Sequence, residues 1–206
     1  LTIFFTKEQY LKKVPAISLR STTSEHKLKE DDEIIVEEET TNISELVFFS
    51  DKANVYKLKT YDMPDSKVAA MGEYLPSLLG LEPGEKIIYT VVTKDFAGNM
   101  LFTFENGKMA KVELKNYETK NNRKKLIGAY SAKSPICDIK YLNEDTDIVL
   151  ITENNRVLYM NTSLVPLKST KSTQGVQVLR QPKGGIKPAK VELASVTTVP
   201  DAPKYV

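Results

Sequence analysis

The pattern of apolar and polar positions repeats four times along the chain. In each copy a short apolar run meets a polar stretch of four residues, and a second, alternating run follows. The copies are residues 1–14 (LTIFFTKEQYLKKV), 45–58 (ELVFFSDKANVYKL), 99–112 (NMLFTFENGKMAKV) and 147–160 (DIVLITENNRVLYM). Short apolar and alternating runs that flank a polar stretch of this length predict a β-hairpin in each copy.

The first apolar residue after each polar stretch provides an anchor, and the anchors Leu11, Val55, Met109 and Val157 lie 44, 54 and 48 residues apart. Strand-built repeats of about 40–50 residues are typical of propeller-like arrays. Further strands are expected at 33–37, 86–93, 136–142 and 186–193, so that each unit is a strand, a loop, a hairpin and a loop. We predict an all-β fold of about four blades of antiparallel strands. Equivalent layers should contain Phe4, Phe48, Phe102 and Leu150.

No linker divides the pattern, so residues 1–194 are expected to form one domain. Residues 195–206 contain two prolines and little periodicity, and we expect a poorly ordered tail there. A helical tendency is confined to residues 67–79, where Gly72 and Pro76 allow at most a short turn. No apolar run approaches 18 residues, which argues against a membrane span.

Candidate catalytic chemistry is sparse. The chain has one histidine, His26, and one cysteine, Cys137, which excludes an internal disulfide framework and a zinc site built from those residue types. We expect His26 to be a solvated surface residue and Cys137 a small buried side chain. There is no glycine-rich phosphate loop in a strand-to-helix context. We therefore expect no catalytic residue, metal site or cofactor in this chain.

Charge is unevenly distributed although the net charge is only +2. Acidic residues gather at 30–33 and 37–39, and basic residues at 12–13, 120–125 and 168–190. Two places after the anchors stand Lys13, Lys57 and Lys111. Because alternate residues of a strand share a face, these lysines should project together from successive blades. Such cations suit a polyanion around the outside, while the alternative is that they serve solubility and block edge pairing.

The residues 46–65 (LVFFSDKANVYKLKTYDMPD) and 66–87 (SKVAAMGEYLPSLLGLEPGEKI) resemble the C-terminal domain of the A subunit of bacterial type IIA topoisomerases, DNA gyrase and topoisomerase IV. Residues 1–15, 27–35 and 171–179 extend the resemblance in order. It implies a β-pinwheel that binds and bends double-stranded DNA around a basic perimeter. It also implies partners, a B subunit with ATPase activity and a second A subunit, and a bacterial cytoplasmic, nucleoid-associated location. The tyrosine nucleophile, Mg²⁺ and ATP of such an enzyme belong outside this chain.

These observations predict a domain that contacts the DNA phosphate backbone without reading the bases. The candidate DNA-binding residues are Lys12, Lys13, Arg20, Lys57, Lys59, Lys108, Lys111, Arg123, Lys124, Lys125, Arg156, Lys168, Lys171, Arg180 and Lys183. The alternative is a propeller-type interaction domain that binds a peptide or protein, although no WD- or kelch-type signature is present.

The loop after the first hairpin departs from the gyrase pattern. Gyrases carry a Gln-Arg-Arg-Gly-Gly-Lys-Gly-like box there, which the resemblance links to tight wrapping and negative supercoiling. Here residues 20–27 retain Arg20 and Lys27 but contain no glycine and include Glu25. Residues 180–185 (RQPKGG) have similar chemistry in a different repeat. The resemblance therefore points to a protein of the topoisomerase IV kind or a divergent gyrase.

Overall fold

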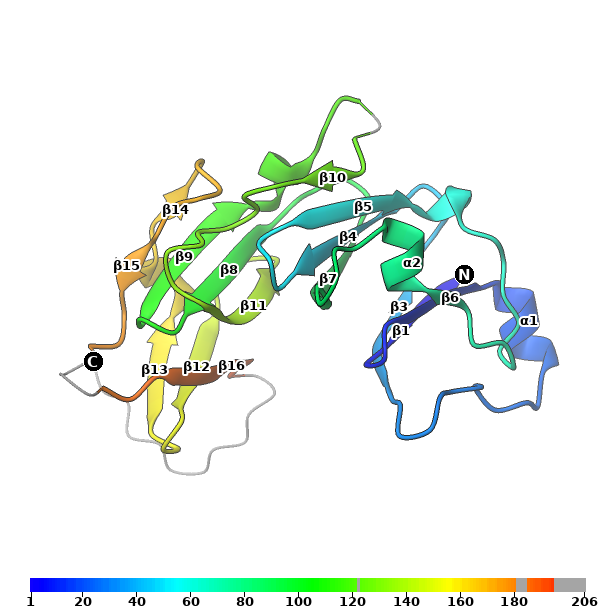
Figure 1. Cartoon of the computed structure of the whole chain (residues 1–206), viewed down its shortest axis with the longest axis horizontal. Coiled ribbons are helices and arrows are strands. Elements are labelled where there is room, and N and C mark those ends of the chain that lie inside the picture. Colours follow the sequence, from blue (N-terminus) through cyan, green and yellow to red (C-terminus); the bar gives the residue numbers. More distant parts are fainter. Residues whose placement is uncertain (122, 181–184, 195–206) are drawn as a thin grey trace. The chain divides into compact units, whose positions relative to one another are not determined.

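The structure, a computed structural model, describes residues 1–121, 123–180 and 185–194. It contains four small sheets, each built around one of the four repeat hairpins (Figure 1). The chain divides into two compact units. Unit 1 comprises residues 1–95 and 121–126, and unit 2 comprises residues 96–120 and 127–206. Each unit contains two of the sheets, which we call A and B in unit 1 and C and D in unit 2.

Unit 1 contains sheet A, with strand order β3-β1-β2-β6, and sheet B, with order β10-β5-β4-β7. The strands of sheet A are β1 (Thr2–Thr6), β2 (Tyr10–Val14), β3 (Ile34–Glu39) and β6 (Glu73–Tyr74). Those of sheet B are β4 (Glu45–Ser50), β5 (Val55–Lys59), β7 (Ile87–Thr93) and β10 (Lys125–Leu126). The connections include α1 (Ala16–Ser21), the 3₁₀ turn η1 (Thr60–Asp62) and α2 (Leu75–Leu79).

Unit 2 contains sheet C, in which β11, β8, β9 and β14 are successive neighbours and β15 also pairs with β9, and sheet D, with order β13-β12-β16. The strands of sheet C are β8 (Asn99–Phe104), β9 (Lys108–Glu113), β11 (Ile136–Leu142), β14 (Leu167–Lys168) and β15 (Val176–Gln177). Those of sheet D are β12 (Asp147–Thr152), β13 (Val157–Asn161) and β16 (Pro188–Leu193). The 3₁₀ turns η2 (Leu114–Tyr117) and η3 (Thr162–Leu164) follow β9 and β13.

The sequence predicts that a single strand precedes the hairpin of each repeat, and the observed strand pairing shows that this order is wrong. Each long single strand returns to the hairpin that precedes it in the chain, so that β3 pairs with β1, β7 with β4, β11 with β8 and β16 with β12. The second hairpin strand then receives a short strand from the loop after the following hairpin. In this way β6 joins β2, β10 joins β5, and β14 and β15 join β9. The blades thus exchange strands, and among the named strands of the described residues only β14 pairs in parallel.

The four hairpin turns share a residue in the left-handed region of φ. The residue two places before each anchor has a positive φ, at Gln9, Ala53, Gly107 and Asn155. In three repeats a hydroxyl closes the turn, because Thr6, Ser50 and Thr152 accept hydrogen bonds from the N–H groups four residues later. In the third repeat Phe104 offers no hydroxyl, and Gly107 adopts the positive φ without the steric cost of a Cβ. The four polar stretches are therefore structural equivalents, as the sequence predicts.

The core of each unit lies between its two sheets. In unit 1, Ile3, Phe5 and Leu11 of sheet A share one apolar cluster with Leu46 and Phe48 of sheet B. The corresponding cluster of unit 2 joins the two sheets through Leu101, Met109, Ile148 and Leu150.

The register confirms that the four predicted layer residues occupy equivalent positions, although Phe4 packs with Val14 and Val68 and not in the cluster between sheets A and B. Phe4, Phe48, Phe102 and Leu150 are all buried, and each pairs with the residue that follows the anchor of its repeat.

Candidate nucleic-acid interface

The lysines that recur two places after the anchors are buried. Lys13, Lys57 and Lys111 are only 4%, 6% and 4% exposed, so the expectation that they project outward together is wrong. The reason is visible in unit 1, where Lys13 lies opposite Ile3 on the face of sheet A that packs against sheet B. A face that packs on another sheet is removed from water whether its residues are apolar or charged.

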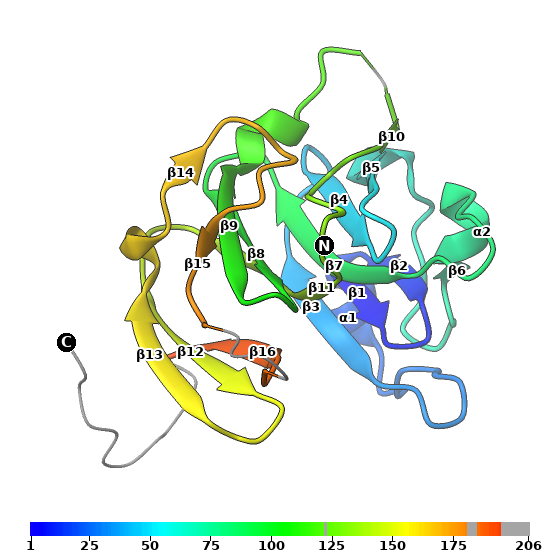
Figure 2. The same cartoon turned by 60° about the vertical axis from the view of Figure 1, so that its left-hand side comes forward.

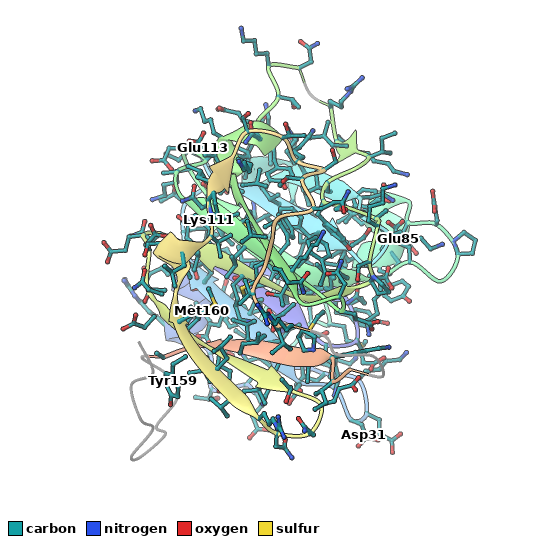
Figure 3. The ribbon with its side chains drawn as sticks, turned by 90° about the vertical axis from the view of Figure 1, so that its left-hand side faces the viewer. Asp31, Glu85, Lys111, Glu113, Tyr159 and Met160 are labelled. Atoms are coloured by element: carbon teal, nitrogen blue, oxygen red, sulfur yellow. The ribbon has the colours of Figure 1, made fainter. Side chains whose placement is uncertain are left out.

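Lys13 and Lys111 make the same interaction in the two units. The ammonium of Lys13 donates to the carbonyl of Thr60 at 3.1 Å, and that of Lys111 donates to the carbonyl of Thr162 at 3.0 Å. Both acceptors are the first residue of the 3₁₀ turn that follows the next hairpin. Figure 3 labels Lys111 on its strand. These two recurring lysines therefore join adjacent sheets of a unit.

A carboxylate completes each of these links. Lys13 lies 3.2 Å from a carboxylate oxygen of Asp65, and Lys111 lies 2.8 Å from one of Asp145. The hydrogen bond from Lys111, together with one from Thr162, holds the pKa of Asp145 below its usual value. An ammonium that is buried with a carbonyl and a carboxylate is satisfied within the fold, and it is not presented to a ligand.

Lys12 is also buried, on the opposite face of β2. The prediction that it is a surface cation available to DNA is therefore wrong. Its ammonium donates to the carbonyls of Val68 at 2.7 Å and Ala70 at 3.0 Å. It lies 5.9 Å from the centre of the Phe4 ring. Burial lowers the pKa of Lys12 from its ordinary value. This side chain fastens the 66–72 segment to sheet A.

Apart from Arg20, the exposed or partly exposed candidates of unit 1 lie at the edge of sheet B that β10 forms. We call Lys59, Arg123, Lys124 and Lys125 the β10 cation group. Lys59 is partly exposed and the other three are exposed. Lys125 pairs with Tyr56 across the strands, and its ammonium lies 5.6 Å from the centre of the Tyr56 ring. It also lies 3.7 Å from a carboxylate oxygen of Glu82. The exchanged strand thus places Lys124 and Lys125 beside β5, although they follow their partners in β5 by about 70 residues in the sequence.

Three candidates of unit 2 lie in β9 or in the segment that contains β14 and β15, and Figure 2 shows these two short strands beside β9. We call Lys108, Lys168 and Lys171 the β14–β15 cation group. Lys168 is exposed and pairs with Val112 of β9, and the partly exposed Lys108 pairs with Gln177 of β15. The ammonium of Lys171 lies 5.9 Å from the centre of the Tyr117 ring.

The remaining candidates are placed apart from these two groups. Arg20 is exposed in the last turn of α1, Arg156 is exposed in the fourth hairpin turn, and Arg180 is exposed after β15. Lys183 lies outside the described residues, as does the segment 195–206 for which the sequence predicts a poorly ordered tail.

The two residues considered for catalysis have structural surroundings. His26 is partly buried against Phe4, with the ring centres 4.4 Å apart, so the expectation of a solvated surface residue is wrong. Burial, with the nearby charge of Lys12, lowers the pKa of His26. Cys137 is half-buried, its Sγ donates to the carbonyl of Pro188 at 3.3 Å, and burial raises its pKa to about 12. Its thiol is therefore protonated near neutral pH and is a poor nucleophile.

Within the described residues, no group of three or more His, Cys, Asp or Glu side chains is arranged to hold a metal ion. No helix in the described part of the chain is long and apolar enough to cross a membrane.

The candidates predicted from the sequence include every cation of the two edge groups. The sequence pattern alone does not distinguish these exposed cations from the buried lysines. A usable signal is the neighbourhood of each lysine. Lys13 and Lys111 stand inside runs whose residues are buried on both faces, whereas Lys124, Lys125 and Lys168 stand in polar segments after a hairpin. The strands β10, β14 and β15, which hold these segments at the sheet edges, have two residues each and are too short to show an alternating pattern.

Four hairpin sheets that exchange strands with the following repeat define the molecule as a four-bladed β-propeller of the strand-exchanging kind. The crystal structure of the C-terminal domain of DNA topoisomerase IV has this fold. It matches with a TM-score of 0.82 and 23% identity, over 93% of this chain and 60% of that one. The family model described as "DNA gyrase C-terminal domain, beta-propeller" matches residues 44–94 and 146–186. In fold and in sequence the chain is thus similar to the C-terminal β-propeller domains of the A subunits of DNA gyrase and topoisomerase IV.

Curated relatives that match the chain include A subunits of DNA gyrase and of DNA topoisomerase 4. The chain is 36% identical over 76 residues to the DNA gyrase A subunit of Helicobacter pylori, a match that covers 36% of this chain and 9% of that protein. It is 23% identical over 151 residues to the DNA topoisomerase 4 A subunit of Bacillus subtilis, which covers 71% of this chain and 19% of that protein. The chain thus matches only a small part of these longer proteins.

Proposed function

We propose that this domain binds double-stranded DNA through its phosphate backbone, by means of the β10 cation group and the β14–β15 cation group. The observation that carries the proposal is the position of these side chains. In both units a group of exposed or partly exposed candidate cations lies on or beside an exchanged strand at a sheet edge, while the recurring hairpin lysines are internal. Lysine and arginine that meet phosphates give affinity without base readout.

Aromatic rings support several of these cations. Lys59 lies 5.6 Å from the centre of the exposed Tyr61 ring, in addition to the ring contacts of Lys125 and Lys171. A ring beneath an ammonium limits the positions of a long side chain and attracts the cation electrostatically. Less conformational freedom then remains to be lost when a phosphate binds.

The domain would act by bending DNA for the A subunit of a type IIA topoisomerase in the bacterial cytoplasm. Bending a 20–30 bp segment costs on the order of 1–6 kcal/mol, which several phosphate contacts must offset. In the parent enzyme the protein partners would be a B subunit that hydrolyses ATP, together with a second A subunit. Mg²⁺ and ATP would be used outside this domain, at a gate that carries the nucleophile and in the B subunit respectively.

The loop after the first hairpin supports placement on the topoisomerase IV side. Residues 20–27 lack the glycines that would let backbone approach phosphates closely, and Glu25 is exposed there. We expect the parent enzyme to relax and unlink DNA with little or no introduction of negative supercoils. Two-dimensional agarose electrophoresis of relaxed plasmid with both subunits and ATP measures this, and robust negative supercoiling would assign the protein to the gyrases.

The direct test of DNA binding is fluorescence anisotropy with a duplex of about 30 bp and random sequence at several salt concentrations. We expect the double change Lys124→Glu with Lys125→Glu, and separately Lys168→Glu with Lys171→Glu, to weaken binding about tenfold or more. Each lost phosphate contact should also make the salt slope shallower by about 0.9. The matched control is the double change Lys29→Glu with Lys133→Glu, which reverses the same number of exposed charges at sites outside both cation groups. An equal loss in the control would show that only net charge matters and would refute the two edges as the binding surface.

A further inference from the structure

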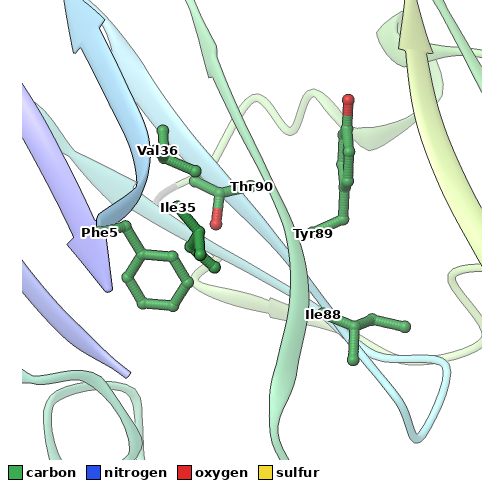
Figure 4. Close-up of a pocket in the computed structure, with 6 residues that line it drawn as sticks. All are labelled: Phe5, Ile35, Val36, Ile88, Tyr89 and Thr90. Atoms are coloured by element: carbon green, nitrogen blue, oxygen red, sulfur yellow. The ribbon is translucent and has the colours of Figure 1, made fainter. Parts of the chain in front are cut away.

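A groove in unit 1 lies between sheets A and B on a different set of strands from the cation groups. Its volume is about 260 Å³, and it is lined by Phe5, Ile35, Val36, Ile88, Tyr89 and Thr90 (Figure 4). These residues belong to β1, β3 and β7, and we call the feature the β3–β7 groove. All of its lining side chains except Thr90 are apolar or aromatic.

Two isoleucines of the groove are exposed because of bulges. On β3 the pairing passes from Val36 to Ile34 and skips Ile35, and on β7 it passes from Tyr89 to Ile87 and skips Ile88. Ile35 is 52% exposed and Ile88 is 37% exposed. A bulge re-aims the side chain of its extra residue. The same bulge position in unit 2 is occupied by Cys137 and Ala189, so the pair of large apolar side chains belongs to unit 1 alone.

Thr90 adds an unsatisfied polar group to this apolar lining. Its Oγ1 is buried and has no hydrogen-bond partner among the described residues. Figure 4 shows the Thr90 side chain on the side of β7 that faces Phe5 and Ile35. A buried hydroxyl without a partner carries a desolvation cost. An occupant that offers a polar backbone group would relieve this cost.

The strands beside the groove fit an extended occupant. β3 ends the strand order of sheet A, and β7 ends that of sheet B. The outer edge of a terminal strand presents backbone N–H and C=O groups to which an added strand can pair.

The charge beside the groove decides what kind of segment fits. β3 continues from Val36 into Glu37, Glu38 and Glu39, which are exposed, and no ion pair recorded for the described residues involves these three. The exposed Lys86 immediately precedes β7, and the ammonium of Lys7 lies 3.8 Å from a carboxylate oxygen of Glu33. Consecutive carboxylates on β3 repel phosphates and attract basic side chains.

We propose that the β3–β7 groove binds an extended segment of a partner protein, in which one branched apolar side chain is flanked by lysine or arginine. The apolar side chain lies against Phe5 and Ile35, on the side of β7 that bears Thr90 (Figure 4), the backbone pairs along the edge of β3, and the basic side chains meet Glu37 and its neighbours. This surface is separate from the proposed DNA-binding edges, and it does not depend on DNA binding.

The test uses the full chain and three dye-labelled peptides, KRKIKRK, KRKAKRK and EDEIEDE, followed by fluorescence anisotropy. We expect KRKIKRK to bind about tenfold more tightly than KRKAKRK, as burial of one isoleucine side chain implies, and EDEIEDE not to bind. Ile35→Ser should abolish this tenfold preference. Ile43→Ser removes another exposed isoleucine of unit 1, outside the groove, and should leave binding unchanged. Thr90→Val, which keeps the shape and removes the hydroxyl, should weaken binding.

Several results would overturn the proposal. Equal affinity for KRKIKRK and KRKAKRK would show that only charge is recognised. Unchanged binding by Ile35→Ser in a variant with a native circular dichroism spectrum would place the peptide elsewhere. Self-association that Ile35→Ser abolishes would assign the groove to a second copy of this chain. Weaker affinity of Ile35→Ser for duplex DNA, with an unchanged peptide affinity, would make the groove part of the DNA surface.

Discussion

At the scale of single residues, burial separates the candidate lysines into an internal set and an exposed set. Lys12, Lys13 and Lys111 donate to backbone carbonyls inside their unit, and Lys124, Lys125 and Lys168 are exposed. In the fourth repeat the position of the recurring lysine is occupied by Tyr159, which is partly buried in β13. Recurrence in a repeat protein can therefore reflect a repeated internal contact as well as a repeated binding surface.

Lys111→Met should lower stability and leave DNA affinity unchanged. Methionine fills similar space, but the buried carbonyl of Thr162 loses the donor at 3.0 Å, a loss of about 1–3 kcal/mol. Urea unfolding measures the change in the free energy of unfolding. The matched control, Lys168→Met on the exposed β14, should alter stability by less than about 0.5 kcal/mol and weaken DNA binding instead. The reverse pattern would restore Lys111 to the DNA-binding surface.

Glu85 provides a second internal network in unit 1. Its carboxylate accepts hydrogen bonds from Ser50, Asn54, Tyr56 and the N–H of Glu82. Burial alone would raise the pKa of Glu85, but these donors outweigh it and hold the pKa at about 2. Burial of Tyr56, together with its bond to Glu85, raises the pKa of the Tyr56 hydroxyl.

Glu85→Gln should destabilise the protein at neutral pH by about 1–3 kcal/mol, because an amide cannot accept from all four donors. The folded-state pKa of Glu85 is depressed, so its contribution is present above the unfolded value of 4.5 and is lost as pH falls towards 2. Urea unfolding from neutral pH down to about pH 2 should therefore show wild type and variant converging as the pH falls. A constant difference across that range would contradict the ionised network.

At the scale of elements, glycines fix where two exchanged strands begin. Gly72 precedes β6 and Gly175 precedes β15, and both have positive φ. A Cβ at either position would collide with the carbonyl oxygen of an anchor residue, Leu11 or Met109. Close backbone approach and left-handed φ thus both require glycine at these two places.

Gly175→Ala should destabilise unit 2 by more than Gly128→Ala. Both glycines have positive φ, which costs a side chain roughly 1–2 kcal/mol, but a Cβ at Gly128 meets nothing within 4 Å. The excess cost at Gly175 measures the collision with Met109. Hydrogen exchange should show faster amide exchange in β9 and β15 of the Gly175 variant. Equal destabilisation by the two changes would mean that β15 can move away at no cost.

At the scale of the whole molecule, the chain path links the two units. Sheet B of unit 1 is completed by β10, which follows the third hairpin, and that hairpin belongs to unit 2. The chain must therefore pass through part of unit 2 before unit 1 is complete. We propose on this ground that residues 1–194 unfold as one cooperative domain.

Differential scanning calorimetry should show one transition with equal calorimetric and van't Hoff enthalpies. A chain that ends at Asp95 lacks β10 and should unfold at a lower temperature than unit 1 within the full chain. Two separate transitions in the full chain, one of them matching this truncated form, would show that the units are independent.

The sequence predicts the hairpins better than the exchanged strands, because hairpins depend on local alternation and exchanged strands depend on distant partners. The hairpins and their buried runs follow from local alternation, as the shared register of Phe4, Phe48, Phe102 and Leu150 shows. The short strands β6, β10, β14 and β15 have two residues each, too few for a periodic signal, and they are held only by their distant partners.

By itself the sequence determined the number of repeats, the position of each turn and the residues of each hairpin, because these depend on neighbours close by in the chain. Only the tertiary structure decided that the face bearing Lys13 and Lys111 is covered and that the edge bearing Lys125 and Lys168 is open. An alternating strand has the same pattern of charge in either case. Whether its polar face meets water or another sheet depends on partners that lie many residues away, and that long-range packing separates a buried, structural lysine from an exposed one.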